Sequence, residues 1–123
     1  MILADTSVWV DHLRSSDHGL VSNLNKGKVV IHPFIIGEIA LGHLIKRKAV
    51  LGELEKLPQV PIAPERVVLN MIERVSLYGT GIGYIDAHLL AAVVANNNCL
   101  LWTRDKKLRT ASVRMNVSAA SLQ

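Results

Sequence analysis

The chain has 123 residues, of which 50% are hydrophobic, 20% are charged and 4% are aromatic, and its formal net charge is +4. This length and composition predict a single domain over residues 1–123 with an aliphatic core, and they exclude a disordered chain. No apolar run reaches the ~18 residues of a membrane-spanning helix. Met1 leads straight into an apolar segment without the basic opening of a secretory signal. We therefore expect a cytoplasmic protein with no membrane partner, and the positive charge favours an acidic partner.

Apolar periodicity and turn residues predict alternating strands and helices along the chain. In chain order, the first half is expected to hold a strand over 2–5, helices over 6–13 and 17–25, a strand over 28–32, and helices over 33–46 and 49–57. The second half is expected to hold a short strand over 59–63, helices over 64–78 and 84–95, a strand over 99–103, a short helix over 105–109 and a last strand over 115–117. This alternation predicts a three-layer α/β/α sandwich with a mostly parallel central sheet.

Three further features of the sequence suggest no chemistry. Cys99 is alone, so it cannot form an internal disulfide, and we expect it to be a small buried apolar residue. The five histidines lack the paired spacing of a zinc site, and most of them are expected to be exposed or partly buried. The glycine-rich run at 79–83 follows a helix and lacks the Lys-Ser/Thr ending of a phosphate-binding loop, so it is interpreted as a flexible connection.

Four acidic residues stand out from their apolar surroundings. Asp5 ends the first expected strand and Asp105 comes just after the strand expected over 99–103, and parallel strands would bring them to one edge of the sheet. Glu38 and Asp86 lie on apolar helical segments with no basic residue nearby to pair with. Because a buried carboxylate is costly without a cation or a metal, these positions are candidates for a functional site.

Each acid also has an ordinary structural explanation. Asp5 could serve as a turn or cap residue, Asp105 as a helix cap, and Asp86 as a first-turn acid that the helix dipole favours. Glu38 could belong to an exposed polar stripe. If the four acids lie close together, their negative charges repel one another unless a divalent cation neutralises them. Hard carboxylate oxygens select Mg²⁺ or Mn²⁺, so the four acids together predict a site for one of these ions.

Four motifs in order resemble those of the PIN-domain family, and in particular the VapC-type toxins. They are Leu3-Ala4-Asp5-Thr6-Ser7, Gly37-Glu38-Ile39, Gly83-Tyr84-Ile85-Asp86 with Leu89-Leu90-Ala91, and Leu101-Trp102-Thr103-Arg104-Asp105-Lys106-Lys107-Leu108. The match covers nearly the whole chain, and Ile39 stands where leucine is commoner in the family.

The resemblance implies a metal-dependent endoribonuclease of a type II toxin–antitoxin system. By this resemblance the catalytic, metal-binding residues are Asp5, Glu38, Asp86 and Asp105, and the supporting polar residues are Thr6, Ser7 and Thr103. The expected chemistry is metal-assisted hydrolysis of RNA phosphodiester bonds, which requires no protein nucleophile. The resemblance further implies a homodimer that a VapB-like antitoxin protein inhibits.

The basic residues after the last motif are candidates for holding the RNA backbone. They are Arg104, Lys106, Lys107 and Arg109. A solvated helix face explains them equally well. The apolar helix faces around Ile36, Leu44 and Ile45 are the expected dimer or antitoxin surface.

Two alternative functions stay open at this point. The chain could be a PIN nuclease of RNA processing rather than a toxin, although its compact length with nothing appended favours the toxin. It could also be a module of the same fold that binds RNA or protein without cutting.

Overall fold

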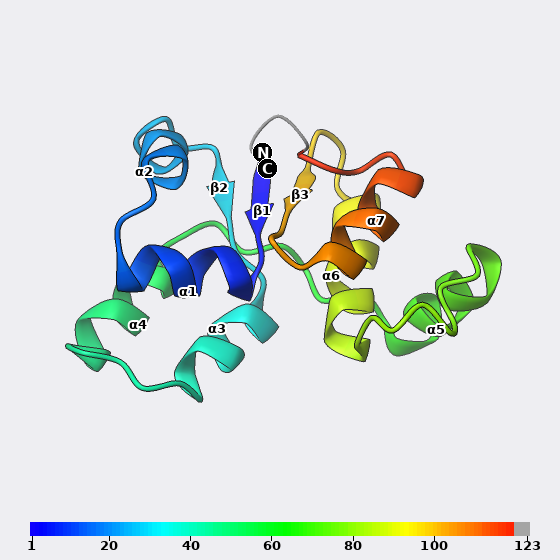
Figure 1. The fold of residues 1–123 in the computed structure, drawn as a ribbon, viewed down its shortest axis with the longest axis horizontal. Helices are drawn as coiled ribbons and strands as arrows, with labels where there is room; N and C mark the ends of the chain where they lie inside the picture. The colour runs from blue at the N-terminus through cyan, green and yellow to red at the C-terminus, as the bar shows by residue number, and fades with distance from the viewer. Residues whose placement is uncertain (120–123) are drawn as a thin grey trace.

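The centre of the molecule is a three-stranded parallel sheet with the strand order β2-β1-β3 (Figure 1). The computed structural model describes residues 1–119, so the last four residues of the expected domain lie outside the described part. The strands are β1 Ile2–Ala4, β2 Val29–Val30 and β3 Leu100–Trp102. In β1, Leu3 pairs with residues of both neighbours and is fully buried. Burial on both faces explains the unbroken apolar runs in these strands.

Seven helices surround this sheet within residues 1–119. They are α1 Thr6–Arg14, α2 His18–Asn25, α3 Pro33–Ala40, α4 Arg47–Glu55, α5 Glu65–Arg74, α6 Tyr84–Ala95 and α7 Lys106–Arg114. Local signals begin several of them: Asp5, Asp17 and Asp105 cap α1, α2 and α7 through their carboxylates.

The order of the strands places the helices in two layers. The chain moves from β1 outward to β2 and then returns across β1 to β3, and crossovers between parallel strands are right-handed. After β2 the chain continues outward through α3 and α4 to the bridge between Ile31 and Gln59, and only then returns through α5 and α6 to β3. Helices α1 to α4 therefore lie on one side of the sheet and α5 to α7 on the other (Figure 1). The expected three-layer α/β/α sandwich with a parallel sheet is confirmed.

The two strands predicted at the edges of the sheet, over 59–63 and 115–117, are each reduced to a single bridge. The segment 59–63 contributes one parallel bridge, between Gln59 and Ile31, and the strand expected at 115–117 is replaced by one parallel bridge between Ser118 and Leu101. The last bridge is displaced because α7 continues to Arg114 instead of ending near residue 109. Leu108, Ala111 and Ser112 on this helix are buried, and this packing extends it beyond the point that the basic run suggested.

Helix α3 is also shorter than predicted, because it ends at Ala40 and not near residue 46. Leu41 and Ile45 continue the apolar pattern of the helix, yet they are 90% and 89% exposed. Helical turns in proteins are stabilised mainly by packing of an apolar face. These residues find no such packing within the described chain, so the helix ends before them.

The core is aliphatic, as expected, with the indole rings of Trp9 and Trp102 buried in it. Cys99 is a free, buried thiol, which confirms the structural interpretation of this residue. Among residues 1–119, no helix combines the length and the apolar character required to cross a lipid bilayer.

Candidate active site

Asp5 lies at the carboxyl end of β1, where the strand order reverses. This position between β1 and β3 is where open α/β sheets bind their ligands, because the flanking crossovers depart to opposite faces and leave a crevice. Asp5 is 95% buried, and one of its oxygens caps α1 by accepting a hydrogen bond from the Val8 amide at 3.3 Å. The residue is therefore both a helix cap and a buried carboxylate at the switch point of the sheet.

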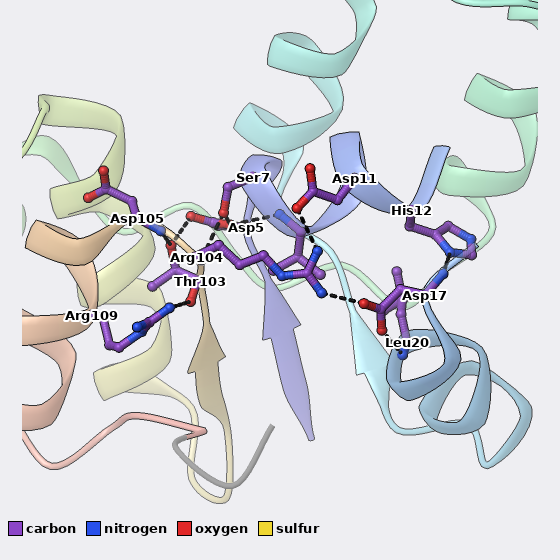
Figure 2. A network of polar contacts seen from close by, with 11 residues as sticks. Asp5, Ser7, Asp11, His12, Asp17, Leu20, Thr103, Arg104, Asp105 and Arg109 are labelled. Atoms are coloured by element: carbon purple, nitrogen blue, oxygen red, sulfur yellow. Dashed lines mark hydrogen bonds and ion pairs between the residues drawn. The ribbon is translucent and has the colours of Figure 1, made fainter. Parts of the chain in front are cut away.

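Two hydroxyl groups hold the Asp5 carboxylate from either side (Figure 2). Ser7 donates to Asp5 Oδ1 at 2.5 Å, and Thr103, which follows β3, donates to Asp5 Oδ2. Each hydroxyl also accepts a backbone amide: Arg104 N–H donates to Ser7 and Asp105 N–H donates to Thr103, at 2.9 and 3.0 Å. Because the amides can only donate, each hydroxyl must direct its own proton to Asp5.

Glu38 projects from α3 and is held in the same manner by α1. Thr6 Oγ1 donates to Glu38 Oε1 at 2.6 Å, which joins two residues separated by 32 positions in the sequence. All three expected supporting groups, Thr6, Ser7 and Thr103, thus bond directly to one of the expected acids.

Asp86 lies in the first turn of α6 and is close enough to the other three acids to be affected by their charges. Burial, and after it the negative charge of Asp5, raise the pKa of the Asp86 carboxyl to about 6. The charges of Asp105 and Glu38 act in the same direction, and a hydrogen bond from the Gly83 backbone opposes them. The pKa of Asp5 is raised as well, mainly by burial. Three acids that are remote in sequence from Asp86 thus lie near enough for their charges to act on its carboxyl.

Asp105 is the most accessible of the four. It caps α7, with Oδ2 accepting the Leu108 amide at 2.8 Å, and its side chain is exposed at the end of β3. The structural explanations of Asp5 and Asp105 as caps are correct. They do not compete with the site, because each carboxylate retains a free lone pair after capping.

None of the ion pairs within residues 1–119 neutralises these four acids. The cations that pair are Lys56 with Glu53, and Arg104 with Asp11 and Asp17. The acids thus form a concentration of negative charge whose donor oxygens suit a hard divalent ion. As they stand, no three His, Cys, Asp or Glu side chains of the described chain are grouped closely enough to hold a metal ion.

The basic residues near the site fall into two groups. Arg104 is tied into the fold: its guanidinium pairs with Asp11 at 2.6 Å and with Asp17, and it lies 5.7 Å from the Trp102 ring. Arg109 points back to the Thr103 carbonyl oxygen at 3.4 Å (Figure 2). Lys106 and Lys107 are exposed and have no ion pair in residues 1–119.

The sequence did not single out Asp11 and Asp17 as the partners of Arg104. Asp17 was expected only as the start of a helix, and no local spacing relates either acid to a residue more than 80 positions later. The Asp17 amide also donates to His12 Nδ1 at 3.0 Å, so this junction between α1 and α2 is hydrogen-bonded from both sides.

Two histidines are more buried than the other three. His32 has no exposed surface and caps α3, with Nδ1 accepting the Phe34 amide at 2.9 Å. Burial lowers the pKa of His32 to about 4, so it is neutral at pH 7. His88 packs its ring against Phe34 and Tyr84, with ring centroids 5.0 and 4.8 Å away. Both histidines act as packing residues behind the site.

An α/β/α domain with a parallel sheet and acids at its switch point matches a known family model. The PIN domain model matches residues 2–113, and the chain therefore belongs to the PIN-domain family. Two curated relatives are 42% identical to the chain over 120 residues. Both are named Ribonuclease VapC32, and they come from two different strains of Mycobacterium tuberculosis. The alignment covers 98% of this chain and 97% of each relative. The resemblance to VapC-type PIN proteins is confirmed.

Proposed function

We propose that this protein is a divalent-metal-dependent endoribonuclease that acts as a VapC-like toxin. The observation that carries the proposal is that the charges of Asp5, Glu38 and Asp105 all act on the Asp86 carboxyl, while none of these four acids pairs with a cation among residues 1–119. The similarity to Ribonuclease VapC32 over nearly the whole chain supports RNA as the substrate.

The four acids would hold Mg²⁺ or Mn²⁺. When bound, such an ion lowers the pKa of a water molecule and neutralises charge that develops on the scissile phosphate. The residues of the chain supply orientation: Ser7 and Thr103 fix the Asp5 carboxylate, and Thr6 fixes Glu38. Hydrogen-bond partners of this kind hold metal-binding side chains in a fixed orientation, and mutation of such partners typically lowers activity.

The decisive comparison is between the wild type and Asp5→Asn, each incubated with RNA in Mg²⁺, in Mn²⁺ and in EDTA. We expect the wild type to cut RNA only with a divalent ion, and Asp5→Asn to lose about 100-fold or more of kcat/KM while it still binds RNA. Expression of both forms in cells, followed by mapping of new RNA 5′ ends, identifies the target. A wild type that binds RNA but never cuts it would instead be the non-cleaving module, and cutting without toxicity would favour an RNA-processing nuclease.

The proposed partner is an antitoxin protein that binds in an apolar groove. Val10, Leu13, Leu44 and Ile45 line this groove between α1 and the segment after α3, and Glu38 lies in the same lining. A partner helix in the groove would reach the acids, and an Arg side chain there would replace the charge of the metal. The same apolar surface is the proposed contact of a homodimer, and the protein is proposed to act in the cytoplasm.

A further inference from the structure

We propose that a basic groove along α7 binds the backbone phosphates of single-stranded RNA beside the acids. This inference rests on the proposed ribonuclease function and names how its substrate is held. The α7 groove is lined by Thr80, Lys106, Lys107, Thr110, Ala111 and Arg114. Its volume is about 370 Å³, within the range of roughly 300–1,000 Å³ typical of ligand pockets.

The chemistry of the lining suits a polyanion. Three of the six residues are cations, two carry hydroxyl groups, and none is acidic. Lys106, Lys107 and Arg114 form no ion pair within residues 1–119, so their charges remain available. Phosphate oxygens accept from Lys, Arg, Ser and Thr side chains, which is the main type of backbone contact in nucleic-acid complexes.

The groove is built by two elements and is not one face of an isolated helix. Lys107 lies across Gly81: a Cβ atom added to this glycine would meet Lys107 Nζ at 2.8 Å. Gly81 has φ +87°, a backbone conformation that favours glycine. The Arg114 guanidinium donates to the Val75 carbonyl oxygen at 2.7 Å, which holds this cation at the far end of the groove. The 79–83 run, interpreted from sequence as a mere connection, thus forms one wall.

The α7 groove begins next to Asp105, one of the four acids. Asp105 caps α7 and directly precedes Lys106, while Lys106, Thr110 and Arg114 follow one another at intervals of four residues on one side of the helix. From residue 106 to residue 114 the helix rises about 12 Å, which leaves room for more than one phosphate. A strand cut at the acids would continue along these cations.

The structure excludes the other two basic candidates from this path. Neither Arg104 nor Arg109 lines the groove, and Arg104 is also paired with Asp11 and Asp17. The proposal therefore assigns phosphate binding to Lys106, Lys107 and Arg114, with Thr80 and Thr110 as hydroxyl donors. It assigns Arg104 and Arg109 to the support of the site.

The test compares two double variants that remove the same charge. K106Q/K107Q changes the groove, and K26Q/K28Q changes two exposed lysines next to the amino end of β2, at the opposite end of the sheet from the acids. Binding of a fluorescein-labelled single-stranded RNA is measured by anisotropy in EDTA over a range of salt concentrations. Cleavage is measured separately as kcat and KM with Mg²⁺.

We expect K106Q/K107Q to weaken binding about tenfold at low salt and to reduce the slope of log K against log salt by about 1.4, because each phosphate contact on a single strand contributes about 0.7. KM should rise while kcat stays within about twofold, since these residues act on binding and not on the chemical step. R114Q should show a smaller change of the same kind, and K26Q/K28Q should resemble the wild type.

Equal changes in both double variants would mean a general effect of net charge and would overturn the proposal, as would no change in either. Loss of affinity for a poly-glutamate peptide with unchanged RNA binding would identify the groove as a protein-docking surface instead. The ribonuclease proposal is tested separately from the groove proposal. A wild type that binds RNA through the groove but never cuts it would refute the ribonuclease proposal and would still support RNA binding by the groove.

Discussion

At the scale of single residues, the site depends on hydroxyl groups whose protons can only be donated to the Asp5 carboxylate. Ser7 and Thr103 each accept a backbone amide and donate to Asp5, so the carboxylate is held in one orientation although it is buried. Thr103 has no exposed surface, so no water can replace it from outside. The orientation of Asp5 thus depends on the backbone amides of Arg104 and Asp105, which follow Thr103 and fix the two hydroxyl groups.

Replacing Thr103 with Val tests this support, because Val keeps the shape and removes the hydroxyl. We expect kcat to fall about 10- to 100-fold. The free energy of unfolding should fall by about 1–3 kcal/mol, because the Asp105 amide loses its partner. The matched control is Ser112→Ala, which removes a fully buried hydroxyl that bonds only within its own helix, to the Arg109 carbonyl. A parallel loss of kcat in the control would show that Thr103 acts only through stability.

The raised pKa of Asp86, about 6, predicts how stability depends on pH. An unfolded aspartate ionises near its ordinary value of 3.8, whereas the folded one keeps its proton up to about pH 6. Between these values the unfolded state binds fewer protons, so stability falls as the pH rises, and above pH 6 the full penalty is present.

Asp86→Asn removes this penalty. In EDTA at pH 7.5 the variant should melt a few degrees above the wild type, since about 1 kcal/mol corresponds to roughly 4 °C for a domain of this size. Near pH 4 the two should melt together, and at pH 7.5 Mg²⁺ should raise the melting temperature of the wild type more than that of the variant. Thermal melts at the two pH values test this prediction. A higher melting temperature of the variant at pH 4 alone would contradict the raised pKa of Asp86.

At the scale of elements, Arg104 joins three pieces of the chain. Its amide bonds to Ser7 in α1, and its guanidinium pairs with Asp11 in α1 and with Asp17, the cap of α2. One side chain from the end of β3 thereby fixes the junction of the first two helices beside the site (Figure 2). The planar guanidinium can reach two carboxylates at once, which the single ammonium group of lysine does less well.

Arg104→Ala should lower the free energy of unfolding by about 1–3 kcal/mol, because two hydrogen bonds to charged groups are lost at a partly buried position. The control is Lys56→Ala, which breaks the pair with Glu53 where both side chains are more than 70% exposed. That pair should contribute about 0.5 kcal/mol or less. Urea unfolding of both variants measures the difference, and equal effects would refute the role of Arg104 as a clamp.

At the scale of the whole molecule, the apolar groove between α1 and the segment after α3 has no partner within the described chain. Ile45 is 89% exposed there, although isoleucine is normally buried. A second apolar hollow next to it is lined by Trp9, Leu24, Ile45, Ala49 and Leu57. An exposed apolar surface of this kind is typical of a protein–protein contact.

Ile45→Glu should leave the melting temperature of the protein within about 2 °C of the wild type, because an exposed side chain contributes little to folding. Light scattering should show loss of the homodimer, and coexpression should show loss of the antitoxin complex. Val113→Glu is the control, since Val113 is 56% exposed on α7, in the opposite layer. If both variants still dimerise and bind the antitoxin, the apolar groove is not the contact surface.

The sequence by itself determined the α/β class and the order of the strands and helices in the centre of the chain, and it singled out the four candidate acids. These features depend on local spacing: an acid directly after a buried strand, or a charge alone on an apolar helix, is visible without knowledge of the fold. It did not determine where α3 and α7 end, because helix ends depend on which apolar residues find a packing partner.

Only the tertiary structure decided which basic residues are free. Arg104 and Lys106 look alike in sequence, yet Arg104 is paired with acids 93 and 87 positions earlier, and Lys106 faces an open groove. Contacts between residues so far apart in sequence arise because β3 pairs with β1 in the sheet, and no local sequence pattern indicates this pairing. For the same reason, only the tertiary structure decided that Thr103 donates to Asp5 and that Thr6 donates to Glu38.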